Sequence, residues 1–588
     1  MAHPRTDRGA TVTQEGYGSD VAIGMLAALG IEYAVINPGA SFRGLHESLV
    51  SAGCPRLVLA LSENIAVAAG HGYAKAAGRP MAVFLHNLVG LQSGSMSIFN
   101  AWADQVPVLI LGGSGPADAT IRRPWIEWIH SCRVQALAVR DYVKWDDQPA
   151  SLPALADSLR RAHRIATTVP YGPAYVAIDV GLQEQRLEAG EGPPADLLPP
   201  SQPTSITAPA GDLEQVADLL VQAERPVIIA DYVGRSEDGY HALTRLAETL
   251  AAPVIDLMAR HNFPTGHWAD ATSARRELLA DADVILCLDL RDLMSGLGEP
   301  DAESHGYRLL ARRDAKVISI STNQLMLKGF IDYSAPAPAW LHALDVLADT
   351  ATCLPVLAEL VTRRAGKRAD RRRELARFTA RVHDRSRSRL AAEAAQGLTM
   401  AALSEGVRDA VADGPWQVAN GHVRGYLRAA WDLTDFNAHL GSNIGAGLGY
   451  GIGVSIGAAL AHEGDDTLIV NLQPDGDLMY TPGGLWTAAR YQLPILTVMV
   501  NNRTYAQDLM HQTLMARVRG RSADAGTGIH LDNPDIDFAM LARAQGVEAW
   551  GPVTGKEEMA RALALAAKVV RDERRPALVD VVLPRQVP

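Results

Sequence analysis

Two polar residues in the last third of the chain stand where a metal ion and phosphate groups could bind. Asp475 follows the apolar run Thr467–Leu472, and Asn502 follows the next apolar run, Ile495–Val500, with a helical stretch between them. In a right-handed βαβ unit both strands point the same way, so both side chains would lie at the carboxyl edge of one parallel sheet. A carboxylate and an amide oxygen suit a hard cation such as Mg²⁺, and Gly476 would let a diphosphate approach the backbone closely. The plainer alternative is a turn at Asp475 and a loop cap at Asn502.

A second pair of polar residues follows strand-like runs near the start of the chain. Glu63 comes after the run Arg56–Leu61 and opens a helical stretch, and His86 ends the run Met81–Leu85. By the same βαβ argument the two side chains would share one sheet edge. A histidine placed there is a candidate for proton transfer. The alternatives are a helix cap favoured by the helix dipole at Glu63 and a hydrogen-bonded strand-end histidine at His86.

The elements that must position these residues form three blocks of alternating apolar runs and helical stretches. This pattern predicts an α/β protein with three doubly wound parallel-sheet domains. The predicted divisions are an N-terminal domain at 1–190, a middle domain at 205–350, a basic helical linker at 351–395 and a C-terminal domain at 396–588. A proline-rich stretch at 193–209 is expected to link the first two domains. The arginine-rich segment Thr362–Arg389 is interpreted as a solvated linking helix, with a phosphate-binding patch as the alternative.

Composition excludes several classes of protein. The net charge of −11 over 588 residues gives no reason to expect nucleic acid as a partner. The four cysteines are far apart, which favours reduced thiols over a disulfide framework or a zinc site. The N-terminus carries no apolar signal core and no apolar run is long enough for a bilayer, so we expect a cytoplasmic protein with no membrane partner.

Several motifs occur together in an order that is specific in combination. PDGD at 474–477 is followed by NN at 501–502, with Asp475 and Asn502 27 positions apart. SENIAVAAGHGYAKAAGRP, LHNLVGLQSGSMSIFNAWADQVPVLIL and NPGAS lie in the first block, and Gly441–Ala458 lies in the third. Across nearly the whole chain these segments resemble the thiamine-diphosphate-dependent enzymes of the pyruvate decarboxylase and acetohydroxyacid synthase type. The segments of the first block look specifically like benzoylformate decarboxylases.

The resemblance implies two cofactors, thiamine diphosphate and Mg²⁺, and assigns roles to particular residues. Glu63 would activate the cofactor, His86 would be catalytic, and the metal would be bound by Asp475, Asn502 and the carbonyl of Thr504. The cofactor-binding residues implied are Glu63, Asn420, Gly421, His422, Gly447, Leu448, Asp475, Gly476, Asp477, Asn502 and Thr504. The N-terminal domain would bind the pyrimidine ring and the C-terminal domain the diphosphate. One departure is Pro474, which replaces the first glycine of the motif, fixes φ near about −65° and removes an N–H group.

The family's two half-sites come from different subunits, which implies a homodimer or a homotetramer. The turn NPGAS would place a substrate contact at Ala40 or Ser41, beside His86. After Thr504 the chain carries the polar residues Gln507, Asp508 and His511. If a helix starts near Tyr505, Gln507 and His511 share one face, and we interpret the three residues as a buried cluster that favours a polar substrate over a bare phenyl ring. The alternative is that these side chains point outward and solvate a surface helix.

The expected function is cleavage or formation of a carbon–carbon bond next to a carbonyl, as a 2-oxo-acid decarboxylase, carboligase or lyase acting on a small molecule. The alternatives are a 2-hydroxyacyl-CoA lyase, with the arginine segment near the CoA phosphates, and a non-catalytic relative that only binds the cofactor. A nicotinamide oxidoreductase is disfavoured because no GxGxxG follows a strand with a suitably placed acidic residue. The middle domain reads ADYVGR at 230–235 where relatives often have a glycine-rich turn, so bound FAD or ADP is not expected.

Overall fold

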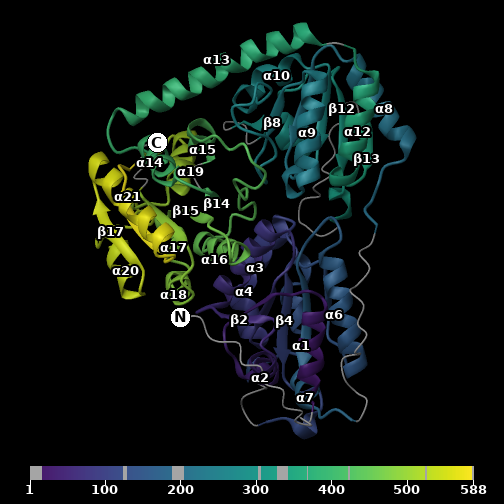
Figure 1. Cartoon of the computed structure of the whole chain (residues 1–588), viewed down its shortest axis with the longest axis vertical. Helices are drawn as coiled ribbons and strands as arrows, with labels where there is room; N and C mark the ends of the chain where they lie inside the picture. Colours follow the sequence, from purple (N-terminus) through teal and green to yellow (C-terminus); the bar gives the residue numbers. More distant parts are fainter. Residues whose placement is uncertain are drawn as a thin grey trace.

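The structure is a computed structural model that describes residues 16–123, 129–188, 204–301, 306–326, 342–366, 368–421, 424–522 and 526–585. Three parallel sheets flanked by helices make up three α/β units. Figure 1 shows the first unit at the bottom in purple and blue, the middle unit at the upper right in teal, and the third unit on the left in green and yellow. The predicted fold class is therefore confirmed. Within the described residues, no helix combines the length and the apolar character that crossing a membrane requires.

The first unit has six parallel strands in the order β2-β1-β3-β4-β6-β5. Its strands are β1 (Tyr33–Ile36), β2 (Arg56–Leu59), β3 (Ala82–Leu85), β4 (Leu109–Ser114), β5 (Trp145–Asp147) and β6 (Ala174–Asp179). Its helices are α1 (Gly18–Ala28), η1 (Ala40–Phe42), α2 (Arg43–Ala52), α3 (Glu63–Ala77), α4 (Asn87–Ala103), α6 (Leu152–Ala166) and α7 (Val180–Glu184). All residues of β1, β3, β4 and β6 are buried, as expected for a sheet covered on both faces.

The middle unit has five parallel strands in the order β13-β12-β9-β7-β8 and a core of its own. Its strands are β7 (Pro226–Ala230), β8 (Val254–Asp256), β9 (Val284–Leu288), β12 (Lys316–Ser321) and β13 (His342–Leu347), beside the antiparallel ribbon β10 (Gly298–Pro300) and β11 (Tyr307–Leu309). Its helices are α8 (Ala210–Gln222), α9 (Glu237–Leu250), α10 (Arg275–Asp281), α11 (Leu293–Leu297) and α12 (Thr350–Arg364). Of the expected linker, residues 193–203 lie outside the described residues, and residues 204–209 lead into α8 without a helix or strand.

The third unit has five parallel strands in the order β14-β15-β16-β18-β17. Its strands are β14 (Trp416–Gly421), β15 (Leu468–Pro474), β16 (Ile495–Asn501), β17 (Glu548–Val553) and β18 (Ala577–Val582). Its helices are α14 (Met400–Val411), α15 (Arg424–Ala430), α16 (Gly451–Ala461), α17 (Asp475–Leu478), α18 (Gly484–Arg490), α19 (Ala506–Val518), α20 (Phe538–Ala544) and α21 (Lys556–Asp572). The helix α13 (Ala369–Ala394) runs along the top of the molecule from the middle unit to the third (Figure 1).

The arginine-rich segment is not one helix. Its first three residues end α12 at Arg364, and residues 369–389 lie in α13, which begins at Ala369. The two parts of the segment differ in their packing. Helix α12 packs on α8 and α9 in the middle unit, whereas α13 spans the outside of the molecule.

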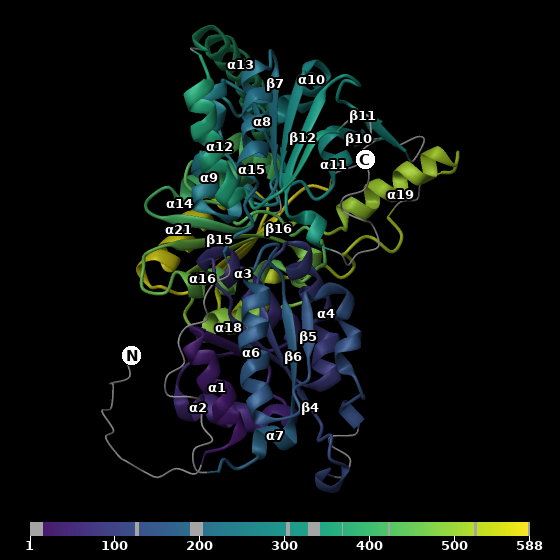
Figure 2. The same cartoon turned by 90° about the vertical axis from the view of Figure 1, so that its right-hand side faces the viewer.

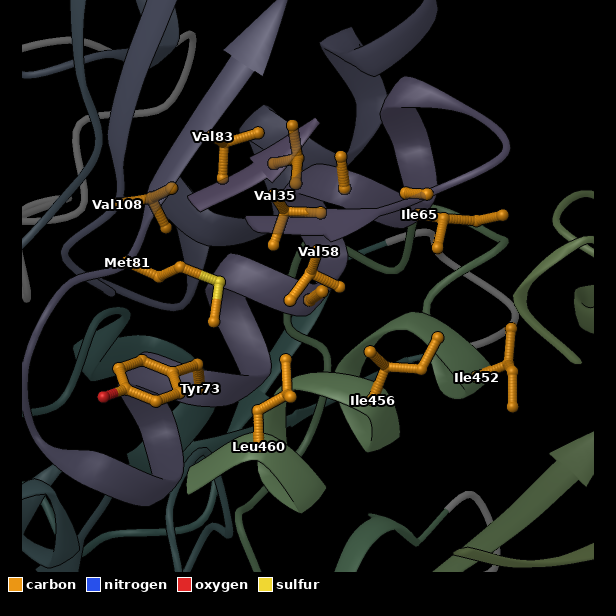
Figure 3. Packing of buried hydrophobic residues seen from close by; sticks show 14 of the residues in the cluster. Val35, Val58, Ile65, Tyr73, Met81, Val83, Val108, Ile452, Ile456 and Leu460 are labelled. Atoms are coloured by element: carbon orange, nitrogen blue, oxygen red, sulfur yellow. The ribbon is translucent and has the colours of Figure 1, made fainter. Parts of the chain in front are cut away.

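The first and third units share one hydrophobic core, although more than 200 residues of chain separate them. Figure 3 shows Ile452, Ile456 and Leu460 of α16 lying against residues of the first unit such as Val58 and Tyr73. Helix α3 crosses α16 at very short distance, and glycines make this possible: a Cβ on Gly457 would lie 1.9 Å from the Ala69 carbonyl oxygen, and one on Gly72 would lie 2.0 Å from the Val454 carbonyl oxygen. This packing fixes the first and third sheets relative to each other (Figure 2).

Candidate active site

Glu63 lies at the first position of α3, at the carboxyl edge of the first sheet. Ser62 caps the helix, because its side chain accepts a hydrogen bond from the Ile65 N–H. The Glu63 carboxylate is partly exposed and accepts a hydrogen bond of 2.8 Å from the Ser93 hydroxyl of α4. Gly90 makes room for it, since a Cβ there would lie 2.9 Å from the carboxylate oxygen. The helix N-terminus places the partial positive charge of its free N–H groups next to this side chain.

His86 follows β3 directly and precedes α4, as predicted. Its Nδ1 lies 2.9 Å from the Ser41 hydroxyl oxygen, which also accepts a hydrogen bond of 3.2 Å from the Asn87 N–H. Asn87 has a φ of +40°, a left-handed conformation that asparagine tolerates better than most residues. Gly39 is required beside this group, because a Cβ there would lie 2.4 Å from the His86 ring.

A second histidine completes this cluster. Nε2 of His86 lies 3.2 Å from Nδ1 of His130, and the two rings meet edge to face at 5.1 Å. Burial lowers the pKa of His86 and the neighbouring His130 lowers it further, whereas the Glu63 carboxylate raises it. Glu63 follows the loop after β2 and His86 follows β3, and both strands pair in parallel with β1, so the two side chains lie at the carboxyl edge of one sheet, as the sequence predicted.

The predicted metal ligands meet at the carboxyl edge of the third sheet. Asp475 comes directly after β15 and Asn502 directly after β16, its neighbour in the sheet. One oxygen of Asp475 accepts a hydrogen bond of 2.6 Å from the Arg503 N–H, and the Asn502 amide oxygen accepts one of 3.0 Å from the Thr504 N–H. Arg503 has a φ of +55°, which turns the loop so that its N–H can reach Asp475.

These residues fit a hard cation by the chemistry of their donor atoms. A carboxylate, an amide oxygen and a backbone carbonyl are all oxygen ligands of the kind that Mg²⁺ accepts, and the phosphate groups of a ligand commonly complete its shell. Burial raises the pKa of Asp475, and the N–H groups of Gly476, Arg503 and Thr504 oppose this shift. A bound cation would favour the ionised carboxylate.

Gly476 and Pro474 are both accommodated in the turn after β15. A Cβ on Gly476 would lie 2.4 Å from a ring carbon of Tyr505, so this glycine is needed for packing as well as for the predicted ligand contact. Pro474 has a φ of −64° and is the last residue of β15, which suits its ring.

Asp477 has partners inside the chain. Its carboxylate accepts hydrogen bonds from the N–H groups of Gly449, Tyr450 and Gly451 at 2.8, 3.4 and 3.1 Å. Asp477 therefore holds the start of α16 beside the carboxyl edge of the third sheet. Its predicted contact with the cofactor stays a prediction.

The loop that carries Gly447 and Leu448 is held by α4 of the first unit. The Asn100 side chain forms two hydrogen bonds with the backbone of Gly447, each 3.0 Å long. Asp104 accepts a hydrogen bond of 2.7 Å from the Ile444 N–H. Leu448 is partly exposed next to these anchors, where it could face a cofactor.

Lys75 of α3 is a buried basic residue beside Asp104, which holds the same loop. It pairs with Asp104 and donates to the Ser442 carbonyl at 2.9 Å and to the Tyr450 hydroxyl at 3.1 Å. Burial lowers the pKa of Lys75 to about 8, against the effect of Asp104. The sequence did not predict this cluster, because nothing in the spacing of Lys75, Asp104 and Ser442 indicates that they meet.

The remaining predicted cofactor contacts lie at the end of β14. Asn420 donates to Asn471 Oδ1 and to the Leu472 carbonyl, both at 3.0 Å, and a Cβ on Gly421 would meet the buried His439. His422 lies outside the described residues. The contacts of Asn420 and Gly421 with a cofactor stay predictions.

The predicted substrate residues fall in two places. Ala40 lines an open hollow of about 550 Å³ together with Pro38, Gly39, Arg43, His46, Glu47 and Val50, while the neighbouring Ser41 is buried. Helix α19 begins at Ala506, as expected, and Gln507 and His511 share a face, with a hydrogen bond of 2.9 Å between them.

The expected burial of the polar cluster is not found within the single chain, where Gln507, Asp508 and His511 are all exposed. The reason is that α19 projects from the side of the molecule (Figure 2) and has only Leu509 buried.

The two edges are built separately. Among the described residues, no hydrogen bond joins Glu63 or His86 to Asp475 or Asn502. Each edge therefore carries one half of the predicted site: Glu63 and His86 lie at the first edge, and Asp475 and Asn502 at the third.

Comparisons with known proteins identify the family. The N-terminal TPP-binding domain of thiamine pyrophosphate enzymes matches residues 17–131, their central domain matches 213–334, and their C-terminal TPP-binding domain matches 420–581. The benzoylformate decarboxylase of Pseudomonas aeruginosa is 26% identical over 542 residues, which cover 90% of this chain and 91% of that protein. A rice protein named "Probable acetolactate synthase 2, chloroplastic" is 24% identical over 593 residues, 97% of this chain and 83% of that protein.

A solved structure shows the same fold. The thiamine diphosphate-dependent 4-hydroxybenzoylformate decarboxylase of Rhodococcus jostii RHA1 superposes with a TM-score of 0.74 at 20% sequence identity, over 97% of this chain and 100% of that one. With three family models matching in order along the chain, the chain belongs to the thiamine pyrophosphate enzyme family.

Proposed function

We propose that this protein catalyses the thiamine-diphosphate-dependent cleavage or formation of a carbon–carbon bond next to a carbonyl, as a 2-oxo-acid decarboxylase, carboligase or lyase. The observation that carries the proposal is the carboxylate of Glu63 at the start of α3, with Gly90 leaving room for it and the Ser93 hydroxyl orienting it. A carboxylate in this setting can hold a hydrogen bond to a ring nitrogen of a cofactor. A relative that only binds the cofactor would have no need of this group.

The chain's own residues account for the other requirements. Asp475, Asn502 and the Thr504 carbonyl would hold Mg²⁺ and, through it, the diphosphate. Bound thiamine diphosphate supplies an electron sink for the bond that breaks. Glu63 would orient and activate its pyrimidine ring, Leu448 would support its bent shape, and His86 would serve proton transfer at the substrate.

The working unit we propose is a homodimer or a larger assembly of dimers. It is supported by the separation of the two edges, because neither edge alone carries both the activating carboxylate and the metal ligands. Phe99 of α4 and Tyr480, which follows α17, are large apolar side chains that are exposed in the single chain, as at surfaces that a second copy covers. Sedimentation of the active protein at micromolar concentration tests this proposal, and an active monomer would contradict it.

The substrate class we propose is a 2-oxo acid, in line with the relative that is a benzoylformate decarboxylase. Helix α13, which carries most of the arginine-rich segment, gives the acyl-CoA alternative no support. Arg373 pairs with Asp370 and Arg387 with Asp384 on the same exposed helix, so these charges are partly neutralised by their neighbours.

The test is turnover of a panel of 2-oxo acids, aldehydes and 2-hydroxyacyl-CoA esters by the purified protein, with thiamine diphosphate and Mg²⁺ added. We expect carbon dioxide release or carboligation with at least one 2-oxo acid, dependence on both additions, and loss of this activity in Glu63→Gln. Turnover of acyl-CoA esters alone would replace the proposal with the lyase alternative. Cofactor binding without turnover of any compound would favour a non-catalytic role.

A further inference from the structure

The Thr504 carbonyl is the one ligand of the predicted metal site that comes from the backbone. Its position therefore depends on the contacts that hold the chain around Thr504. Thr504 is 3% exposed, and its N–H donates to the Asn502 amide oxygen at 3.0 Å. This bond ties Thr504 to a second predicted ligand, but the Thr504 carbonyl belongs to the next peptide group and needs contacts of its own.

A short segment later in the chain, residues 526–531, lies against this loop and supplies those contacts. Thr504 forms an antiparallel β-bridge with His530. Two backbone hydrogen bonds frame the bridge, from the Tyr505 N–H to the Ile529 carbonyl at 3.1 Å and from the Leu531 N–H to the Arg503 carbonyl at 2.8 Å. The loop is thus held on both sides of Thr504.

The pattern of the bridge determines the direction of the Thr504 carbonyl. The two framing bonds use the neighbours of Thr504, so Thr504 and His530 are a pair that exchanges no backbone hydrogen bond with each other. The peptide group that joins Thr504 to Tyr505 is planar and trans, and its N–H points to the segment 526–531, so its carbonyl points the opposite way. The Thr504 carbonyl and N–H therefore face the same side, where the Asn502 amide oxygen lies.

The side chains of Thr504 and His530 join the same pair a second time. Directly opposed residues of this kind carry their side chains close together on one face. The Thr504 hydroxyl lies 3.0 Å from Nδ1 of His530. The ring is seated on Gly526, where a Cβ would lie 2.3 Å from Nε2, and the Gly526 carbonyl accepts the Ile529 and His530 N–H groups at 3.1 and 3.3 Å. One compact turn therefore holds the histidine against Thr504.

We propose that residues 526–531 form a clamp that aims the Thr504 carbonyl at the bound cation, and that His530 is the positioning residue of this clamp. The inference rests on the proposed function and deepens it, because it assigns the geometry of the metal site to a segment that the sequence did not single out. His530 is no metal ligand in this proposal, since it acts only through Thr504.

The clamp bears on the choice between cations. Mg²⁺ requires near-ideal octahedral geometry with bonds of about 2.0–2.1 Å, whereas Ca²⁺ accepts bonds of about 2.3–2.6 Å and an irregular set of ligands. A displaced Thr504 carbonyl therefore weakens the binding of Mg²⁺ more than that of Ca²⁺. A general loss of stability would lower the affinity for both cations alike.

The variants His530→Leu and Thr504→Val each remove one partner of the side-chain hydrogen bond, and His530→Asn keeps a polar group near the place of Nδ1. Calorimetric titration of Mg²⁺ or Ca²⁺ into the protein with excess thiamine diphosphate, without substrate, gives the affinity for each cation. We expect the first two variants to bind Mg²⁺ about tenfold or more weakly, as when a group that orients a metal ligand is lost. Their affinity for Ca²⁺ should fall less, and His530→Asn should stay close to the wild type.

The double variant tests whether the two side chains act as one unit. Because both substitutions break the same bond, the double variant should bind Mg²⁺ no more weakly than either single variant. Losses that add up would overturn the clamp, because the side chains would then act independently. An equal fall of the affinities for Mg²⁺ and Ca²⁺ would overturn it as well.

The matched control is His462→Leu, at the amino edge of the same sheet, where His462 has Asp465 and Gln417 within 2.9 and 3.3 Å. It should leave both affinities unchanged, and melting temperatures of the metal-free variants show whether any loss reflects unfolding. A wild type that bound neither cation would overturn the metal assignment and this inference with it. Normal binding by the wild type with unchanged binding by His530→Leu would overturn this inference alone.

Discussion

The carboxyl edges of the first and third sheets both carry polar residues directly after parallel strands, but these residues have different hydrogen-bond partners. At the first edge, the side chains of Glu63, His86 and Ser41 bind mainly other side chains, namely Ser93, His130 and one another. At the third edge, Asp475 and Asn502 bind backbone N–H groups. Side-chain partners can gain and lose protons, whereas backbone N–H groups only orient oxygen atoms. The contrast agrees with the roles we propose, in which the first edge would handle protons and the third would hold a cation and an anion.

The two edges are mechanically joined, although no hydrogen bond links their polar groups in the part of the chain that the structure describes. Helix α3 begins with Glu63 and packs along α16, and α16 follows the loop that carries Gly447 and Leu448. Asn100 and Asp104 of α4 hold the same loop. A change at one edge can therefore displace the other through this packed core.

The largest effect is expected at the third edge. Asp475→Ala and Asn502→Ala should each abolish retention of thiamine diphosphate, because each removes one oxygen ligand from a site with a single carboxylate. Equilibrium dialysis with thiamine diphosphate and Mg²⁺ measures this. Asp466→Ala, at an exposed aspartate of the same unit, should bind normally, and unchanged affinity in both site variants would remove the metal assignment.

The first edge should show the opposite behaviour, with binding kept and chemistry lost. Glu63→Gln retains a side chain that can reach the cofactor but lacks the charge, so activity should fall by about 10²-fold or more. Exchange of the cofactor's C2 proton with deuterium reports the activation directly. Ser93→Ala, which only releases the carboxylate, should cause a smaller loss. A wild-type exchange rate in Glu63→Gln would exclude the activating role.

His86→Ala tests the proton-handling side of the same edge. We expect kcat to fall by about 10²-fold while the cofactor still binds, since one positioned acid–base group is removed. Stopped-flow turnover and dialysis, performed on the same preparation, separate the two quantities. Normal turnover with a lowered melting temperature would instead assign His86 a purely structural part.

The sequence predicted the two edges because they rest on local patterns. Asp475, Asn502, Glu63 and His86 each follow an apolar run, and parallel strands bring their ends to one edge whatever lies between them. His130 was not predicted, since it lies in the long connection between β4 and β5, and only the folded chain brings it to His86. The division of the arginine segment was also missed, because its composition is uniform while its burial is not.

The close packing of α3 on α16, which connects the two edges, can be tested at its glycines. Gly457→Val would place a side chain against the Ala69 backbone carbonyl, which cannot move without shifting α3. We expect a loss of about 1–3 kcal/mol in the free energy of unfolding, visible as a lowered melting temperature in scanning calorimetry. Gly211→Ala, where a Cβ would meet no atom within 4 Å, is the control and should not destabilise the protein. A wild-type melting temperature for Gly457→Val would contradict the close crossing of α3 and α16.

The smallest effect concerns the choice of substrate. Gln507 and His511 share one face of α19 and are exposed in the single chain, so they can select a substrate only if a second copy closes the cleft over them. His511→Phe removes one polar partner, and a lost hydrogen bond of about 0.5–1.5 kcal/mol corresponds to about a two- to tenfold change in preference. The measurement is kcat/KM for benzoylformate and for oxygenated 2-oxo acids with the wild type and the variant. A shift toward benzoylformate in the variant is expected, because the phenyl ring gains an apolar neighbour. If the wild type used benzoylformate efficiently and the variant did not differ, the face of α19 would be a solvated surface, and the hollow lined by Ala40 would be the place to seek specificity.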